Sequence, residues 1–376
     1  MRDIKNETMI LDEVKFTKTG EEEFYKVLRK RVNTYFKDNK ISKFGNSKMY
    51  FKTIIMLAMY LVPFILILTY LENPWLIVLM WAIMGVGMAG TGMSVMHDAN
   101  HGSYSKTKWV NTLVGKVILI VGGSDVNWRI QHNVLHHTYT NVVGMDEDID
   151  IGDLMRFSPG QELLKAHKYQ HLYAWFLYGM MTLMWATTKD FTQFYRYKKK
   201  GLLSTQDVSE KGFLTSLIIG KIGYLAVTLA LPLLLSPLAW WGTVLAFALM
   251  HYIAGLILSI VFQAAHVVPT AQYSEVQEDG SIDLDWAANQ MINTADFGQK
   301  KKLLSWYVGG LNFQIEHHLF PNICHIHYKD IANIVRDTAF EYNLPYYTYP
   351  TFRNAVSNHA KMLYALGHNE EAPGIH

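Results

Sequence analysis

Long apolar stretches alternate with polar segments along this chain. Four of them approach or reach the length of about 20 residues that an α-helix needs to cross a bilayer. They cover about residues 51–70, 75–96, 213–235 and 239–261. The stretches come in pairs, because only the short turns 71–74 and 236–237 separate the members of each pair. The pattern predicts two transmembrane helical hairpins and disfavours two buried hairpins in a soluble protein.

Basic residues lie on one side of these hairpins. Neither turn contains Lys or Arg, whereas basic residues precede, separate and follow the hairpins. Examples are Lys43, Lys48, Lys106, Lys108, Arg129, Lys198 to Lys200 and Lys300 to Lys302. By the positive-inside rule, the N-terminus, the middle section and the C-terminus are cytoplasmic. The predicted fold class is an all-α integral membrane protein, with four transmembrane helices in two hairpins capped by a helical cytoplasmic domain.

The polar segments suggest three parts. Residues 1–48 form a cytoplasmic N-terminal segment, 49–340 the membrane domain, and 341–376 a cytoplasmic C-terminal tail. The polar start of the chain predicts no cleaved signal peptide. Residues 21–39 fit an amphipathic helix that either lies on the membrane surface or packs on the cytoplasmic domain.

Two further apolar segments, 109–124 and 172–188, are predicted not to span the membrane. The first is interrupted by glycines and a lysine, and the second is short, closely flanked by charges and rich in aromatic residues. We expect a re-entrant or interfacial segment over 109–124 and an interfacial helix over 172–188. If residues 172–188 crossed the membrane, the segments before and after them would face opposite sides.

Composition narrows the chemistry. The chain has 376 residues, of which 50% are hydrophobic, and a formal net charge of +2, so its overall charge does not indicate a nucleic-acid partner. The single cysteine, Cys324, excludes an intrachain disulfide and a CxxC motif, and no role is assigned to it.

Three histidine clusters lie in the polar segments next to the predicted spans. They are His97 with His101, then His132 with His136 and His137, and lastly His317 with His318, preceded by Gln314. Within each cluster the spacing of three to five residues places the side chains on one face of a helix. Such spacing suits metal ligands, although any one cluster alone also fits surface, core or interfacial histidines.

Other polar residues are candidates for the same region. His266 ends the fourth stretch on the side of the first cluster and is a candidate eighth histidine ligand. His251 lies deeper in that stretch and is expected in the core, whereas His167 and His171 are expected at the surface. The acidic run over residues 146–153 either hydrogen-bonds the outer nitrogens of ligating histidines or forms a solvated loop, and we expect the loop.

The predicted topology brings eight histidines to one cytoplasmic face, which suggests two metal ions. Imidazole suits iron, zinc, copper and nickel, and a shell without cysteine argues against an iron–sulfur centre. Breaking an unactivated C–H bond of a lipid needs a metal that activates O2, and this chemistry fits a site beside apolar hairpins. A metal transporter would need polar groups inside the spans, which offer little beyond Lys221 and His251.

The three clusters together resemble the histidine boxes of the membrane fatty acid desaturases. The matching motifs are His97-xxx-His101, His132-xxx-His136-His137 and Gln314-xx-His317-His318, with flanking matches at 138–141 and 309–312. Gln314 in the third box resembles the front-end group, which includes the delta-5 and delta-6 enzymes and linoleoyl-CoA desaturase-like proteins. The resemblance covers about residues 50–340, including the layout of the four spans.

This resemblance implies a non-haem di-iron enzyme that uses O2 and two electrons to introduce a cis double bond into an acyl chain. It implies that the eight histidines ligate iron and that Gln314 ligates weakly or holds a water on the iron. The substrate would be an acyl-CoA or an acyl-lipid, bound in an apolar, bent tunnel between the hairpins. A lipid hydroxylase or ketolase on the same scaffold is the alternative.

The sequence departs from the front-end pattern in two respects. Three residues separate His132 from His136, where many animal front-end enzymes have two, which weakens only the subgroup assignment. The HPGG motif of a fused cytochrome b5 domain is absent, so the expected electron donor is a separate ferredoxin or cytochrome b5. Basic residues such as Lys198–Lys200 and Lys300–Lys302 could dock an acidic donor, or equally bind anionic lipid head groups or an acyl-CoA phosphate.

Overall fold

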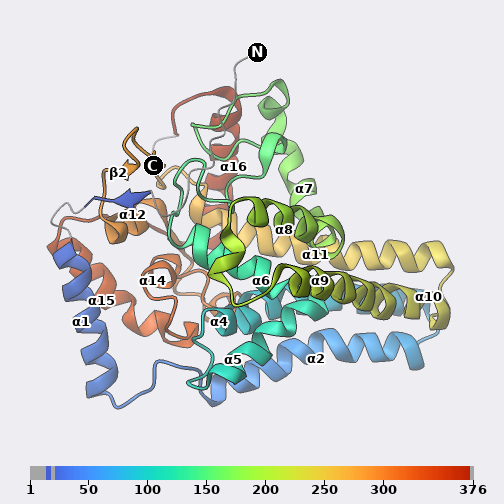
Figure 1. The fold of residues 1–376 in the computed structure, drawn as a ribbon. Helices are drawn as coiled ribbons and strands as arrows, with labels where there is room; N and C mark the ends of the chain where they lie inside the picture. Colours follow the sequence, from blue (N-terminus) through green and yellow to red (C-terminus); the bar gives the residue numbers. More distant parts are fainter. Residues whose placement is uncertain (1–13, 18–21, 373–376) are drawn as a thin grey trace.

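The computed structural model describes residues 14–17 and 22–372, and these residues are mainly helical (Figure 1). Parts of the predicted N-terminal segment (1–13 and 18–21) and the last four residues lie outside the described residues. Among the described residues, four helical stretches are long and apolar enough to cross a membrane. They are α2 (Ser47–Thr69), Pro74–Asn100, Glu210–Leu235 and α11 (Trp240–His266). The second stretch comprises α3 (Pro74–Gly90), η2 (Thr91–Met96) and α4 (His97–Asn100). The third comprises α9 (Glu210–Leu225), η9 (Ala226–Ala230) and α10 (Leu231–Leu235). The four predicted apolar stretches are thus confirmed as helices.

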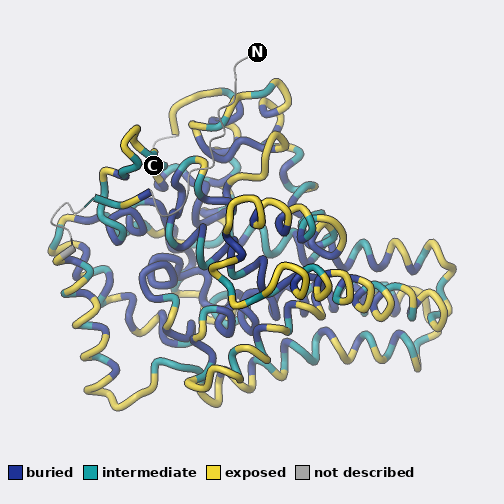
Figure 2. The backbone as a smooth tube through the Cα atoms, in the orientation of Figure 1, coloured by how far each residue is buried: buried dark blue, intermediate teal, exposed yellow. Residues whose placement is uncertain are grey.

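The apolar helices project from one side of the molecule, with α2, α10 and α11 at the right of Figure 1. Their outward faces carry large apolar side chains, and Ile54, Leu234 and Leu245 are 65%, 80% and 62% exposed. A soluble protein rarely exposes so large an apolar surface, and Figure 2 marks much of these helices as exposed. The chain is therefore a membrane protein.

Small residues let these helices pack closely. A Cβ on Gly87 would lie 2.7 Å from the backbone of Met59, and one on Gly85 would lie 2.6 Å from the carbonyl oxygen of Met250. Glycine removes these clashes, so α3 approaches both α2 and α11 at backbone distance.

The segment predicted as re-entrant forms a sharp bend. Helical stretches α5 (Lys108–Gly115) with η3 (Lys116–Val121) and α6 (Asp125–Trp128) with η4 (Arg129–His136) meet at 107°. Gly122 has a φ of +84° at the bend, a conformation that glycine adopts without strain. This shape is that of a broken span or a re-entrant segment.

Residues 172–188 fall in α7 (Gln170–Met184) and η7 (Trp185–Lys189), which continue into α8 (Asp190–Lys199). Over the part of the chain that is described, this stretch is not among the candidate membrane spans. Helix α7 packs along α11, where a Cβ on Gly255 would lie 2.6 Å from the Tyr178 carbonyl oxygen. The sequence therefore predicted its helical character, and α11 covers one of its faces.

The remaining elements lie outside the four apolar helices. The helices are α1 (Glu22–Asp38), η5 (Gly152–Leu154), η6 (Lys165–Tyr169), η8 (Leu202–Thr205), α12 (Trp286–Asn293), α13 (Lys302–Tyr307), α14 (Gln314–Leu319), η10 (His325–His327), α15 (Tyr328–Glu341) and α16 (Phe352–His368). Two short parallel strand pairs join distant segments, β1 (Lys15–Phe16) with β2 (Ser281–Ile282) and β3 (Asp296–Phe297) with β4 (Thr348–Tyr349). In register, Lys15 lies opposite Ser281 and Asp296 opposite Thr348. Of these elements, α1, α12, α14, α15 and β2 gather at the opposite end of the molecule from the projecting helices (Figure 1).

The apolar face of helix α1 packs inside the protein. Phe24, Leu28 and Val32 are buried in a cluster with residues of α12, α14 and α15. Arg31 also donates two hydrogen bonds to the carboxylate of Glu341, at 2.8 and 2.7 Å. Of the two alternatives for this amphipathic helix, packing on the other helices is the one observed.

The segment after residue 341 is not a tail. It forms β4 and α16, and α16 packs against α7 and α11. His359 on α16 is buried, with Nε2 2.7 Å from the Tyr178 hydroxyl and Nδ1 2.8 Å from the Val267 carbonyl oxygen. The prediction of a tail overlooked the helical spacing of apolar residues such as Met362, Leu363 and Leu366, which α16 buries.

Candidate metal centre

One histidine cluster lies in a π-helix and another directly follows one. His97 begins α4, directly after the π-helix η2, and the His101 amide donates to the His97 carbonyl at 3.1 Å, one α-helical turn away. The second cluster lies in the π-helix η4, where the His137 amide donates to the His132 carbonyl at 2.9 Å. The second cluster is therefore helical, as its spacing predicted, with a π-helical turn. A wider turn brings residues five apart into alignment, and π-helical turns frequently occur at functional sites.

The third cluster lies on α14, as its spacing predicted. Gly309 and Gly310 precede it with φ values of +63° and +70°. A Cβ on Gly309 would lie 2.5 Å from the Met93 carbonyl oxygen, so glycine lets this turn touch η2. The turn places α14 beside the residues that lead to His97.

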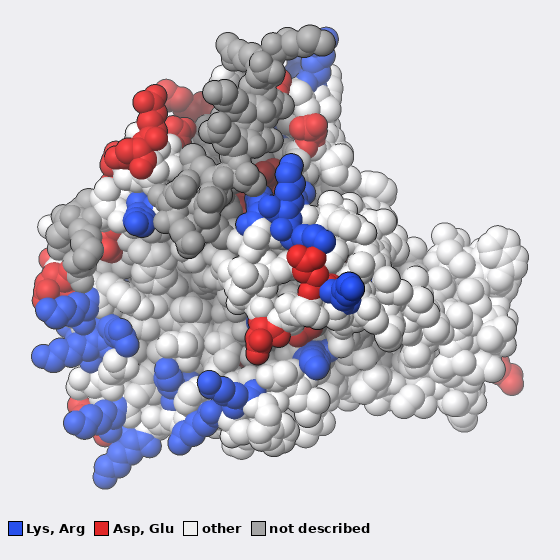
Figure 3. All heavy atoms as spheres, viewed as in Figure 1, with Lys and Arg blue, Asp and Glu red and all other residues white. Residues whose placement is uncertain are grey.

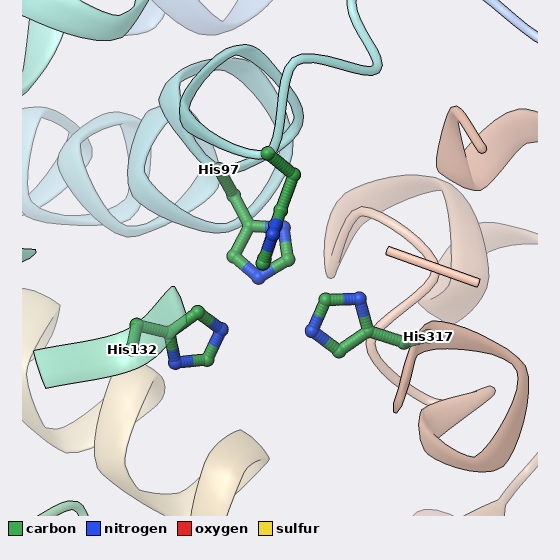
Figure 4. A group of neighbouring side chains, drawn as sticks. His97, His132 and His317 are labelled. Carbon is green, nitrogen blue, oxygen red and sulfur yellow. The ribbon is translucent and has the colours of Figure 1, made fainter. Parts of the chain in front are cut away.

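The fold brings all eight histidines together, and their ring nitrogens form overlapping groups. His97, His101, His132 and His317 offer nitrogens within 4.8 Å of one another, and so do His136, His266 and His318. A further group of His137, His317 and His318 connects the two. Figure 4 shows the rings of His97, His132 and His317 turned toward a common space.

The outer ring nitrogens of several histidines have defined partners. The partner is Asp146 Oδ2 for His136 Nδ1 (2.9 Å), Asp148 Oδ2 for His132 Nδ1 (3.1 Å), Tyr328 OH for His317 Nδ1 (3.2 Å) and Gln290 Oε1 for His318 Nδ1 (2.8 Å). Such partners fix the ring orientation and leave Nε2 free to bind a metal. The expectation of a solvated acidic loop is wrong for Asp146, which is buried, and for the carboxylate of Asp148.

The inner nitrogens show that the residues fit a cation. Within the described chain, the buried Nε2 atoms of five histidines lack a hydrogen-bond partner; these are His97, His101, His136, His266 and His318. The Nε2 of His137 lies 3.0 Å from that of His317 and 3.3 Å from that of His132. Buried polar atoms without partners are costly, and a metal bound between them would satisfy these nitrogens.

The electrostatics favour neutral ligands at most positions. Burial lowers the pKa of five histidines well below the usual value, and neighbouring imidazoles lower it further. The five are His101, His132, His137, His317 and His318. At His136 burial also lowers the pKa, but the carboxylates of Asp146 and Asp148 outweigh it and raise the pKa. A neutral imidazole is the form that ligates a metal.

Gln314 lies among these residues with its side chain buried. Neither its amide oxygen nor its amide nitrogen has a hydrogen-bond partner among the residues described. It lines the same cavity as His97 and His317. The sequence therefore identified a residue that the fold places beside the histidines.

The structure separates other histidines from this group. His251 is buried and hydrogen-bonds Tyr224 and Thr182, as expected of a core residue. His167 was expected at the surface, and this prediction is wrong. It is buried, its Nδ1 accepts from the Leu164 amide and its Nε2 lies 3.0 Å from the Asp153 carbonyl oxygen. His171 lies on α7 and is partly exposed.

Sequence reasoning missed a buried chain of polar groups next to His97. Asp98 Oδ2 lies 2.8 Å from Nδ1 of His325, and Nε2 of His325 lies 2.7 Å from Nζ of Lys52. Cys324 is buried beside them. The only sequence signal was Lys52 inside an otherwise apolar stretch. His325 follows Lys52 by 273 residues and Asp98 by 227, so no short spacing connects it to either residue.

An apolar cavity of about 420 Å³ opens at the histidines. Its walls include Met93, Met181, Leu258 and Phe262, and it reaches His97, His132 and His317. The volume falls in the range of about 300–1,000 Å³ typical of small-molecule sites. The polar residues Lys189, Gln193 and Arg196 line another part of the wall.

Fold and site thus define a helical membrane protein with a histidine-rich centre, which could hold metal ions, beside an apolar cavity. The family model described as "Fatty acid desaturase" matches residues 73–350. The chain belongs to this family, and it is an oxidoreductase of the fatty acid desaturase class.

Similar proteins carry names of the same kind. The sn-1 linoleoyl-lipid 6-desaturase of Arthrospira platensis is 35% identical over 94% of this chain and 95% of its own length. The corresponding 6-desaturase of Synechocystis is 33% identical over 95% of this chain and 98% of its own length. The acyl-lipid (8-3)-desaturase of Physcomitrium patens is 36% identical over 93% of this chain and 72% of its own length. These relatives support the resemblance to front-end desaturases.

Proposed function

We propose that this enzyme is an O2-dependent acyl desaturase that introduces a cis double bond into the acyl chain of a membrane lipid at a di-iron site. The observation that carries the proposal is the meeting of two histidine groups, the first of which lines an apolar cavity. His97, His101, His132 and His317 would hold one iron, and His136, His266 and His318 the other. His137 lies between the groups, and Gln314 ligates weakly or through a water.

Iron with O2 supplies the oxidising power that breaks an unactivated C–H bond, which acidic and basic side chains cannot do. The protein supplies orientation. Asp146 and Asp148 accept the Nδ1–H of their histidines, so each Nε2 lone pair points inward. Tyr328 and Gln290 hold the outer nitrogens of His317 and His318 in the same manner.

The acyl chain would lie in the apolar cavity, where side chains exclude water and hold one segment of the chain beside the histidines. Met93, Met181 and Leu258 contribute apolar walls. The names of the relatives specify acyl lipids, which supports an acyl-lipid over an acyl-CoA substrate. Their regiochemistry supports a front-end desaturase.

The topology that we propose has two membrane hairpins and a helical cytoplasmic cap within one desaturase domain over residues 49–340. Both termini and the histidines would be cytoplasmic. The absence of Lys and Arg from the turns 71–74 and 236–237 supports this orientation. Electrons would come from a separate ferredoxin or cytochrome b5 type protein.

Expression in a host that lacks polyunsaturated lipids tests the function. Gas chromatography–mass spectrometry of the host lipids should show a new cis double bond, and the purified protein should hold two irons per chain. The His317→Ala variant provides the inactive control. Hydroxylated lipids without a new double bond would replace the desaturase proposal with the hydroxylase one.

A further inference from the structure

The outward face of α1 is strongly basic. Tyr25 lies in a shallow groove along this helix, together with Lys26, Arg29, Lys30 and Lys37. Figure 3 shows basic side chains over α1 at the left edge of the molecule. Within the described residues, Lys26 has a salt bridge to Glu23 (3.4 Å), whereas Arg29, Lys30 and Lys37 have none. The groove therefore offers a net positive surface to an acidic partner.

Its location argues against membrane lipid as that partner. Helix α1 lies at the end of the molecule opposite the projecting apolar helices (Figure 1). A partner bound there would be a soluble protein on the face away from the bilayer. The lysines around residue 199 are less suitable, because Lys198 pairs with Glu210 at 2.6 Å and Lys200 with Glu147 at 3.2 Å.

Two hydrogen-bonded contacts connect this groove to the histidines. The Tyr25 hydroxyl donates to the Leu319 carbonyl oxygen at 3.1 Å, one residue from His318. The Tyr25 ring also meets the Trp286 ring edge-on, with centroids 5.3 Å apart. Trp286 Nε1 in turn donates to the carbonyl oxygen of His137 at 3.1 Å. Electrons tunnel fastest through bonds, hydrogen bonds and close ring contacts, so these residues form a short route from groove to centre.

We propose that the basic groove of α1 docks an acidic one-electron carrier protein, and that Tyr25 and Trp286 connect the carrier to His137 and His318. The inference rests on the proposed function, since only a redox centre needs such a route. Two carrier molecules each lose one electron per turnover. These two electrons, two protons from water and the two hydrogens removed from the acyl chain reduce O2 to two molecules of water.

The test measures oxidation of a pre-reduced carrier by the full-length, iron-loaded enzyme in lipid nanodiscs. Two acidic carriers serve as probes, a plant-type ferredoxin and the soluble domain of a cytochrome b5. The Arg29→Glu/Lys30→Glu variant should slow carrier oxidation by about tenfold or more at low salt, and the difference should shrink at high salt. The Lys165→Glu/Lys168→Glu variant, which changes an exposed basic pair on η6, is the matched control and should keep the wild-type rate.

A small chemical reductant separates docking from catalysis. Turnover driven by reduced methyl viologen needs no docking, so the α1 variant should match the wild type in that assay. Trp286→Leu should also slow carrier oxidation while retaining wild-type iron content, which a merely structural role would not predict. Its carrier rate should keep the wild-type salt dependence, because the docking charges remain.

Three results would overturn the inference. One is carrier oxidation by the α1 variant at the wild-type rate with both probes. The second is a larger loss in the Lys165/Lys168 control. The third is an equal loss with viologen, together with weaker binding of the variant to anionic vesicles, which would assign the groove to lipid. Absence of product from the wild type with viologen would instead contradict the proposed function, and carrier oxidation still tests the docking.

Discussion

Buried histidines occur in two regions of this protein, and their hydrogen bonds differ. Away from the centre, both nitrogens of His251, His359 and His167 have partners. At the centre, His136 and His318 bond through Nδ1, while their Nε2 atoms lack a partner within the described chain. Burial alone therefore does not identify a ligand, whereas an inner nitrogen with no partner other than another histidine of the centre does.

The difference also separates two uses of buried polar groups. A histidine with both nitrogens bonded ties helices together, as His359 ties α16 to α7 and to the end of α11. A buried histidine nitrogen without a hydrogen bond destabilises the fold, and a ligand bound to that nitrogen offsets the destabilisation.

Removal of an inner ligand should have the largest effect. His136→Ala and His317→Ala should each reduce iron content and abolish the lipid product, because one nitrogen of a candidate iron site is lost. Metal analysis and gas chromatography–mass spectrometry provide the two measurements. Full iron occupancy in either variant would show that the replaced histidine is not a metal ligand.

Loss of an outer partner should come next. Asp146→Ala removes the carboxylate that orients His136, and it should cost about 10–100-fold in iron affinity or activity. Asp153→Ala in the same acidic run is the matched control, because Asp153 is exposed. Equal effects of the two variants would show that Asp146 acts only through the charge of the loop.

A structural histidine should affect stability and not iron. His251→Ala leaves Tyr224 and Thr182 without their partner and should lower the free energy of unfolding by about 1–3 kcal/mol. Denaturation in detergent measures this loss, and the iron content should match the wild type. Iron loss without destabilisation would instead show that His251 is a metal ligand.

Gln314 should give the smallest change. Gln314→Ala should lower the iron content less than Asp146→Ala does, because an amide binds iron weakly or through a water. Gln314→His should retain iron more strongly than the wild type during dialysis against a chelator. A Gln314→Ala variant without any iron would make Gln314 an inner ligand of full strength.

Several features could be predicted from the sequence because their signals are local. Apolar length identified the four long helices, and the spacing of Gln314, His317 and His318 predicted α14. The resemblance of the three motifs led to the family. Local spacing did not distinguish the π-helical turn of η4 from an α-helical one, and the amphipathic spacing of α16 was overlooked.

Pairings between distant segments were not predicted, because short spacings along the chain do not indicate them. The pairing of Asp98 with His325 joins positions 227 residues apart, and the bond from Trp286 to His137 joins positions 149 apart. The acidic run over 146–153 offered several carboxylates, and its spacing did not distinguish Asp146 from the exposed Asp153.

The sequence by itself determined the apolar stretches, the residue types of the metal centre and the family, because hydrophobicity and short spacings are local properties. Only the tertiary structure decided which nitrogen of each histidine faces inward, which carboxylates hold the outer ones, and that α1 lies against the residues beside His137 and His318. Those outcomes depend on hydrogen bonds and packing between segments that are far apart in the chain and meet only in the folded protein.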